Sequence, residues 1–341
     1  MARTHVWLLS LGGPASEEEL TPWLTAVLRD PTMLPLPAVF LRALVVWLLV
    51  RGRAQAYLPA VRQLGGPAPQ LDALEHQARG LARLLGPRYA VSPVFRHAGV
   101  DARRAAAGVA KGDRVVLLPM HPQLHGGAVR AALDEARASL QGRGAQIAQL
   151  EGWATAAGYL DALAAAVRRA LVEGEGRAGL LLVARGLSAR QAALGDPYPG
   201  QVAETAAALR AALPGLPVAL CFAPVGYLAG PLRSHGPPPA AGLEQLRAAG
   251  AQRALVLALG GATDDLEAAW ARRGPLAEAA QGLRLQRVEP PVNTPGFGRT
   301  LLSLVRRVER SAGWDIPEDT HKDDILDEMQ RRGLRPLPEG R

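Results

Sequence analysis

The segment GLLLVARGLS, residues 179–188, decides the fold class. Its residues are apolar up to Ala184, and the run ends abruptly at Arg185 and Gly186. An apolar run of this length is too short for a free-standing helix and is typical of a strand buried in a parallel sheet. Open α/β sheets bind ligands at the carboxyl ends of their strands. The segment therefore predicts a buried strand that delivers Arg185 to a functional edge.

Strands and helices alternate on both sides of this segment. The expected strands cover residues 6–11, 89–94, 114–118, 145–150, 179–184, 217–222, 253–259 and 284–288. Such alternation indicates parallel sheets, and a chain of 341 residues has room for about two domains. We predict an α/β protein with two Rossmann-like domains whose parallel sheets face a central cleft.

The predicted domain organisation has four parts. Residues 1–140 form the first domain, which includes an apolar helix at 38–50, and residues 141–295 form the second domain. A helix at 296–312 crosses back to the first domain, and residues 313–341 form a charged tail. The apolar helix is either a core helix or an exposed lip over a pocket or a lipid surface.

Composition excludes several classes of protein. The net charge of +8 comes almost entirely from Arg, with no Arg cluster interleaved with aromatic residues, so we expect no nucleic-acid partner. A single cysteine, Cys221, excludes an internal disulfide and an iron–sulfur cluster held by the chain's own cysteines. The longest apolar segment is shorter than the ~18 residues that span a bilayer. With no secretion-signal pattern at residue 1, we expect a cytoplasmic protein.

A series of short motifs, collinear over about residues 6–312, resembles the motifs of the ferrochelatase family. They are LSLGGP at 9–14, LRDP at 28–31, the apolar segment with Arg51 and Arg53, LGGPAP at 64–69 with Gln77, FRH at 95–97, LPMHPQ at 118–123, GDPY at 195–198 with Gln201 and Thr205, GGATDDLE at 260–267 and VNTPGF at 292–297. The resemblance implies a chelatase-like fold. It also implies insertion of Fe²⁺, as a substrate, into a porphyrin during haem biosynthesis.

One departure from the family's motifs concerns the centre of its site. In the family, a histidine at the end of a central strand and the glutamate of "DxLETL" face each other across the porphyrin. Glu267 stands at the glutamate position, so the resemblance implies that it handles metal and pyrrole protons, whereas Arg185 stands at the histidine position. A neutral imidazole can accept a proton or ligate a metal ion, but a guanidinium group can do neither. The alternative role of Glu267 is structural, in which its carboxylate stabilises the first turn of its own helix.

The resemblance implies further residues that bind the substrate. They are Ser10, Arg51, Arg53, Arg96, His97, His121 and Gln123. The arginines would anchor propionates beside the flat apolar surface of the lip helix. His121 is also a candidate metal ligand beside Glu267. The tail lacks cysteine, so the iron–sulfur extension of some ferrochelatases is not expected.

Two interpretations of Arg185 remain open. In the first, His121 and His125, or His97, replace the missing base or ligand, although Pro122 predicts a loop in which no common face is assured. In the second, Arg185 pairs with Glu267 or a propionate, and the protein binds protoporphyrin, coproporphyrin or haem without inserting metal. A sirohydrochlorin- or cobalt-type chelatase is a further alternative. We expect a porphyrin-binding protein with impaired or altered metallation, with possible peripheral membrane contact through the lip helix, and we leave its oligomeric state open.

Overall fold

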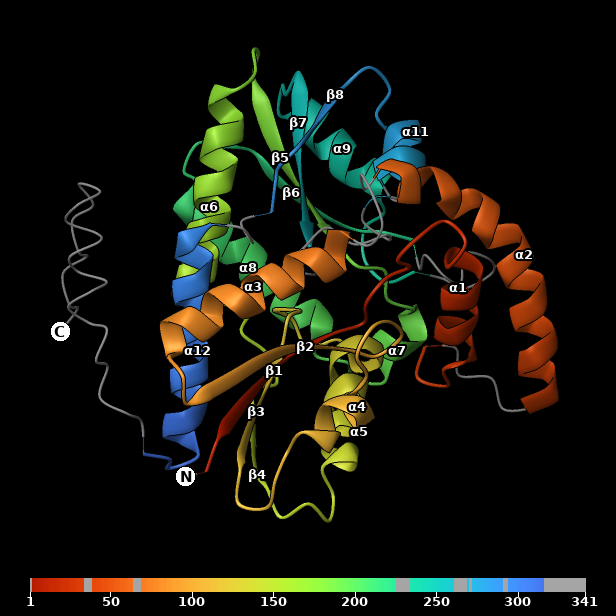
Figure 1. Ribbon diagram of the computed structural model, residues 1–341. Helices are drawn as coiled ribbons and strands as arrows, with labels where there is room; N and C mark the ends of the chain where they lie inside the picture. Colours follow the sequence, from red (N-terminus) through yellow and green to blue (C-terminus); the bar gives the residue numbers. More distant parts are fainter. Residues whose placement is uncertain are drawn as a thin grey trace.

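The protein is built around two parallel β-sheets (Figure 1). The computed structural model describes residues 2–33, 39–63, 69–224, 234–260, 269, 272–290 and 294–315. The first sheet contains β1 (Thr4–Ser10), β2 (Tyr89–Phe95), β3 (Arg114–Pro119) and β4 (Gln146–Gln149). The second contains β5 (Ala178–Ala184), β6 (Val218–Phe222), β7 (Arg253–Leu259) and β8 (Arg284–Arg287).

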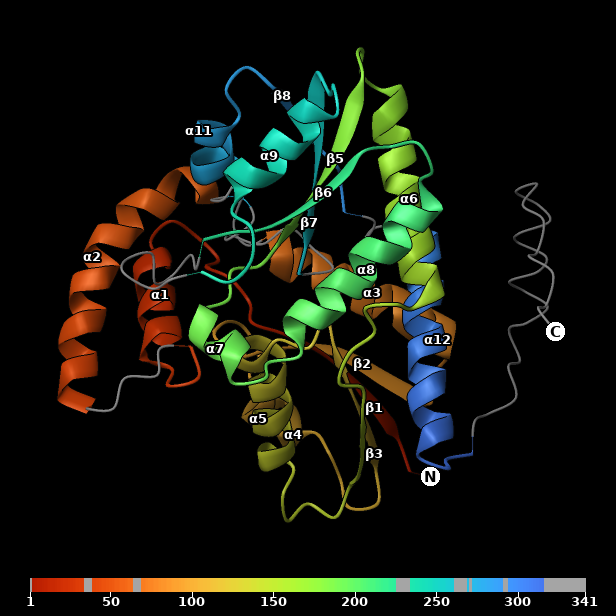
Figure 2. The same cartoon turned by 180° about the vertical axis from the view of Figure 1, so that it is seen from behind.

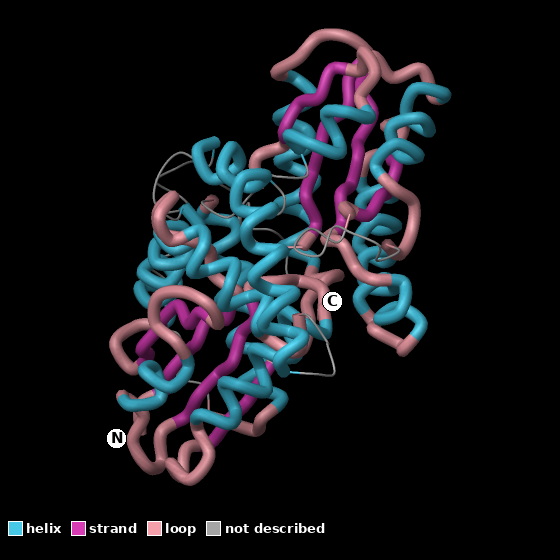
Figure 3. Tube along the Cα trace, turned by 90° about the vertical axis from the view of Figure 1, so that its right-hand side faces the viewer, coloured by secondary structure: helices cyan, strands magenta, loops and turns pink. Residues whose placement is uncertain are grey.

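The two sheets have the same strand order. The first runs β2-β1-β3-β4 and the second runs β6-β5-β7-β8, and every strand pair is parallel. Figure 3 shows the two sheets in separate halves of the molecule. The predicted α/β fold with two parallel sheets is therefore confirmed.

The first sheet extends further along the chain than the predicted boundary at residue 140. β4 pairs with β3, with Arg114 opposite Gln146 and Leu117 opposite Gln149. The sequence QIAQ of this edge strand is exposed or half-buried, so it lacks the apolar run that marks the central strands. The transition between the halves therefore comes after Gln149.

The helices surround the sheets on several sides. They are α1 (Leu20–Arg29), α2 (Val39–Gln63), α3 (Pro69–Leu85), α4 (Ala102–Ala107), α5 (Ala131–Ser139), α6 (Ala157–Val172), α7 (Ala189–Ala193), α8 (Tyr198–Ala212), α9 (Pro239–Ala248), α11 (Ala277–Ala279) and α12 (Pro295–Ser311), with short π-helical turns at Gly126–Arg130 and Arg272–Leu276. Figures 1 and 2 show α1 and α2 beside each other at one side of the molecule. The tail predicted at 313–341 lies outside the described residues from 316 onward.

The helix predicted at 38–50 is longer in the structure. α2 continues through Arg51 and Arg53 to Gln63, with Pro59 inside it. The prediction ended it where the apolar run ends, but polar residues on a solvent face do not stop a helix. Tyr57 and Val61, in its second half, are buried in a cluster with α1.

One hydrophobic core joins both halves of the molecule. It contains Leu8 of β1, Leu180 and Leu182 of β5, and Leu301 of α12. α12 packs against α3 and α6 and also contacts β3 and β4. The last helix of the described chain therefore lies on the first sheet, although the chain reaches it from the second.

A buried polar triad fixes α12 to β2. The Tyr89 hydroxyl donates to Glu309 at 2.8 Å, and Arg306 donates to Glu309 at 3.0 Å and also to the Tyr89 oxygen. Arg306 also lies over the Tyr89 ring, 5.3 Å from its centroid. Burial, followed by the contact with Glu309, raises the pKa of Tyr89 to about 12. The phenol therefore stays protonated and continues to donate.

We predict that Glu309→Gln lowers the free energy of unfolding by about 3 kcal/mol, because it leaves the Arg306 charge buried without a carboxylate. Urea unfolding followed by circular dichroism measures the change. The control is Glu75→Gln, which removes an exposed ion pair with Arg79 and should cost less than about 1 kcal/mol. Equal losses in the two variants would contradict a role for the triad in holding α12.

Candidate functional site

Arg185 lies at the carboxyl end of β5, as the sequence predicts. It is buried, with 8% of its surface exposed, and its backbone N–H donates to the Tyr198 hydroxyl at 2.7 Å. Gly260 directly follows β7, and a Cβ atom there would lie 3.4 Å from the Cβ of Arg185. The ends of the two central strands of the second sheet therefore meet around Arg185.

The loop that follows β3 reaches the same place from the first sheet. Its His125 is buried and packs edge-on against Tyr198, with 5.0 Å between ring centroids. Burial and then the positive charge of Arg185 lower the pKa of His125 to about 4, against opposing contributions from Asp196 and the Gly186 backbone. The imidazole is therefore neutral at pH 7, and the carboxyl ends of the two sheets face each other at His125 and Arg185.

Side chains around the start of α8 clamp the loop after β3. Asp196 accepts a hydrogen bond from the Gly126 backbone N–H at 3.0 Å, and Gln201 accepts one from the Leu124 N–H at 2.7 Å. The other carboxylate oxygen of Asp196 accepts from the Tyr198 N–H at 3.0 Å, which fixes the first turn of α8. The loop after the motif at 118–123 is therefore hydrogen-bonded to side chains in and just after the motif at 195–198.

Gln123 takes part in this clamp. Its side chain is 1% exposed, and its amide nitrogen donates to the Thr205 hydroxyl at 3.1 Å. Thr205 in turn donates to backbone carbonyls, with Ala154 O at 3.0 Å. His121 lies earlier in the same loop and is also buried. For both Gln123 and His121, substrate binding stays a prediction.

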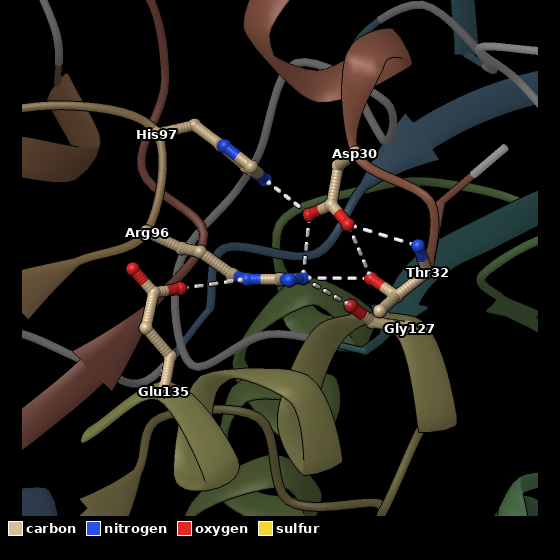
Figure 4. Close-up of polar contacts among 6 residues, drawn as sticks. All are labelled: Asp30, Thr32, Arg96, His97, Gly127 and Glu135. Atoms are coloured by element: carbon tan, nitrogen blue, oxygen red, sulfur yellow. Dashed lines mark hydrogen bonds and ion pairs between the residues drawn. The ribbon is translucent and has the colours of Figure 1, made fainter. Parts of the chain in front are cut away.

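Arg96 and His97 lie in a second polar cluster, with Asp30 between them (Figure 4). The Arg96 guanidinium pairs with Asp30 at 2.8 Å and with Glu135 at 3.1 Å, and His97 Nε2 lies 3.2 Å from the same Asp30 oxygen. Arg96 also donates to the Thr32 hydroxyl at 2.9 Å and to the Gly127 carbonyl at 3.0 Å.

Asp30 stays ionised in this cluster. Burial raises its pKa, but hydrogen bonds from His97 and Thr32 and the charge of Arg96 outweigh burial and lower the pKa to about 2. The Arg96 guanidinium is thus held by carboxylates of the protein itself. Its role as an anchor for propionates stays a prediction, in which a ligand would share Arg96 with these partners.

The remaining predicted residues lie on different elements. Arg51 is exposed on α2 and stacks over Trp47, 5.0 Å from the ring centroid, and Arg53 is half-buried further along α2. Ser10 ends β1, beside the end of β3. Glu267 lies outside the described residues.

The described residues provide no ready-made metal centre. In that part of the chain, no three His, Cys, Asp or Glu side chains gather closely enough to hold a metal ion. A metal ligand set that includes Glu267 stays a prediction. Among the described helices, none has the length and apolar character needed to cross a membrane.

The family model for ferrochelatase matches residues 3–309. The chain belongs to the ferrochelatase family. It is 26% identical to a ferrochelatase of Geotalea uraniireducens over 318 residues, covering 91% of this chain and 99% of the relative. It is 25% identical to a ferrochelatase of Citrifermentans bemidjiense, covering 89% and 98%, and 29% identical to one of Caulobacter vibrioides, covering 61% and 62%.

Two solved structures resemble this ferrochelatase-family chain. One is CbiX, the terminal enzyme for biosynthesis of siroheme in denitrifying bacteria, with a TM-score of 0.48 and 16% identity, covering 89% of this chain and 98% of CbiX. The other is DR2241 from Deinococcus radiodurans, a multi-domain protein with structural similarity to chelatases. Its TM-score is 0.48 at 18% identity, covering 89% of this chain and 55% of DR2241.

The sequence did not indicate that Asp196, Tyr198, Gln201 and Thr205 act on the loop after β3. One signal was available: Gln201 and Thr205 are four apart on a helix, so they share a face and can contact one partner. The sequence named His125 as a candidate without placing it. The structure brings it to Arg185.

We predict that Arg185→Met raises the pKa of His125, because it removes the guanidinium charge that helps to keep the imidazole neutral. NMR titration of the His125 ring protons measures the shift. Because the pKa of His125 is lower in the folded protein, the unfolded chain binds more protons between about pH 6.5 and pH 4. The contribution of His125 to the free energy of unfolding is therefore highest above pH 6.5 and decreases as the pH falls to 4. An unchanged His125 pKa in the variant would show that Arg185 does not act on it.

Proposed function

We propose that this protein binds a porphyrin between the carboxyl ends of its two sheets and inserts Fe²⁺ into it slowly, in haem biosynthesis. The proposal rests on the buried Arg185 at the end of β5. By the resemblance of its motif, Arg185 stands where the family has a histidine. Family membership supports the reaction, and the identity of this residue supports the low rate.

The composition of α2 suits contact with a flat, anionic macrocycle. On α2, Leu44, Trp47 and Leu48 each expose more than half of their surface, which offers an apolar face. Arg51 and Arg53 follow on the same helix and supply cations for propionates. Apolar contact combined with a few cations matches the chemistry of protoporphyrin, coproporphyrin and haem.

Arg185 opposes metallation in two ways. A guanidinium group has no lone pair for a pyrrole proton, and losing a positioned general base costs about 10²- to 10⁴-fold in rate. Charges of +1 and +2 at 4–6 Å repel by roughly 5–8 kcal/mol at an effective dielectric constant near 20. Glu267 is proposed as the carboxylate that offsets part of this repulsion and handles the metal.

A second candidate function rests on the same buried cation. A protein that only binds and holds a tetrapyrrole needs no acceptor at Arg185, and a guanidinium group favours carboxylates. A more carboxylated macrocycle of the sirohydrochlorin type also suits an arginine-rich site. The choice of macrocycle separates these functions experimentally.

We predict that Arg185→His raises the rate of Fe²⁺ or Zn²⁺ insertion by about 10- to 100-fold, because it restores an acceptor and removes a cation. Anaerobic insertion assays on wild type and variant measure the change. Arg190→His is the matched control, since Arg190 is exposed on α7. A normal enzyme rate in the wild type that falls in Arg185→His would contradict the proposed slow insertion.

Binding is measured separately on the same proteins. Titration with protoporphyrin, coproporphyrin and haem, followed by the Soret band, gives a dissociation constant for each. No saturable shift below about 100 μM, which corresponds to about −5.5 kcal/mol, would count against porphyrin binding. Binding without insertion supports the non-catalytic alternative, and preference for an octacarboxylate precursor supports the sirohydrochlorin-type one.

We further propose that the protein works in the cytoplasm and touches a membrane surface through α2. Its exposed Trp47 and Leu48 offer apolar contact, and Arg51 offers a cation for anionic lipid.

We predict that Trp47→Ser with Leu48→Ser reduces sedimentation with anionic vesicles several-fold, because apolar contact area is lost. Val172→Ser, at an exposed residue at the end of α6, is the control, and equal loss in both proteins would contradict the α2 contact.

A further inference from the structure

We propose that His125 is the proton acceptor of this protein and stands in for the histidine that Arg185 replaces. The inference rests on the proposed function and deepens it, because it names the group that receives the pyrrole protons. It follows from the position of His125, from its free lone pair and from the residues that hold its loop.

His125 comes from the opposite sheet to the family's histidine position and reaches the same point. It follows β3, whereas Arg185 follows β5, yet both contact Tyr198. Gly126 and Leu124, its neighbours in the chain, are each fixed through a backbone N–H to the start of α8. His125 is therefore held on both sides, as a group that acts on a bound molecule must be.

The imidazole has acceptor capacity to spare. It is more than nine-tenths buried, and its Nδ1 atom has no hydrogen-bond partner among the described residues. Burial and the nearby charge of Arg185 keep the ring neutral at pH 7. By contrast, the ring of His97 is held against the Asp30 carboxylate at 3.2 Å. His125, and not His97, is therefore the histidine beside Arg185 with a ring nitrogen that is unpartnered among the described residues.

The proposed step balances without a further reactant. A pyrrole N–H bond of the macrocycle breaks, its electron pair stays on the nitrogen and binds Fe²⁺, and the proton bonds to Nδ1 of His125. The imidazolium then releases the proton to water, and a second transfer completes the loss of two protons for each metal ion inserted. Fe²⁺ is not oxidised or reduced.

The groups around His125 make it a weak base. Arg185 opposes a positive charge on the ring, whereas Asp196 and the Gly186 backbone favour one. The Tyr198 ring packs against it edge-on. A weaker base takes protons more slowly, which fits the slow insertion proposed above. Removing the charge of Arg185 without adding a new acceptor should therefore speed insertion through His125.

The experiment combines Arg185→Met with His125→Gln in anaerobic insertion assays. Methionine is uncharged and offers no nitrogen lone pair, so any gain must come from another base. We expect Arg185→Met to raise the rate about 10-fold, and His125→Gln to lower the rate about 100-fold in both the wild-type and the Arg185→Met proteins. His76→Gln, at an exposed residue of α3, is the control and should leave the rate unchanged.

The pH profile provides a second readout that needs no change at His125. The wild-type rate should be flat between pH 5 and 8, because an acceptor with a pKa of about 4 is deprotonated throughout. In Arg185→Met the rate should rise with pH over part of this range. A profile that does not move, or an unchanged rate in His125→Gln, overturns the inference, as does a wild-type rate no higher than the uncatalysed one.

Soret titration separates the possible failures. A His125→Gln protein that binds porphyrin with the wild-type dissociation constant but inserts metal more slowly supports the acceptor role. Equal binding and equal rates overturn the inference and leave the proposed function intact. A wild-type protein that binds none of the three tetrapyrroles overturns both.

Discussion

The clamp between the loop after β3 and the start of α8 is the interaction on which the rest of the site depends. Two backbone N–H groups of the loop donate to the side chains of Asp196 and Gln201, and Gln123 donates to Thr205. Buried polar groups of this kind are costly unless they are paired, so the loop has one favourable position. That position puts a segment of the first sheet directly against the second.

The clamp determines which charges meet. A buried guanidinium group at the end of β5 makes a second positive charge beside it unfavourable, and His125 responds by staying neutral. Tyr198 contacts both groups. Its hydroxyl accepts a hydrogen bond from the Arg185 backbone N–H, and its ring packs against the His125 ring. The guanidinium group at the end of one strand therefore changes the chemistry of a residue that follows a strand of the other sheet.

The cluster around Arg96 connects the same region to α1 and α2. Asp30 follows α1, and Glu135 belongs to α5. Gly127 lies two residues after His125 in the chain. Side chains of α1 and α2, together with Ala269, form a hydrophobic cluster that is distinct from the cores under the two sheets. The polar cluster in Figure 4 therefore fixes this separate helical unit to the segment that carries His125.

The amino-acid pattern was sufficient to predict the two sheets and the place of Arg185 at the end of a strand. A short apolar run such as 179–184 that ends at a charged residue and a glycine is typical of a buried strand in an α/β chain, and the charged residue then lies at the carboxyl edge of the sheet. Alternating strands and helices were sufficient to predict two parallel sheets. The strand at β4 was predicted, but the sequence did not show that it joins the first sheet. The second half of α2 has no apolar run, and the predicted helix ended too early there.

Which side chains act together depends on the packing of the folded chain. The clamp joins residues that are 70, 77 and 82 positions apart, and no spacing rule in a sequence pairs residues over such distances. Arg96 and Gln123 look like ligand-binding residues in the sequence, because charged and amide side chains have the same chemistry toward a substrate and toward the protein. The burial of Arg96 against Asp30 depends on how the segment after β2 packs on the end of α1. The contact of Gln123 with Thr205 and the meeting of His125 with Arg185 depend on how the two halves pack.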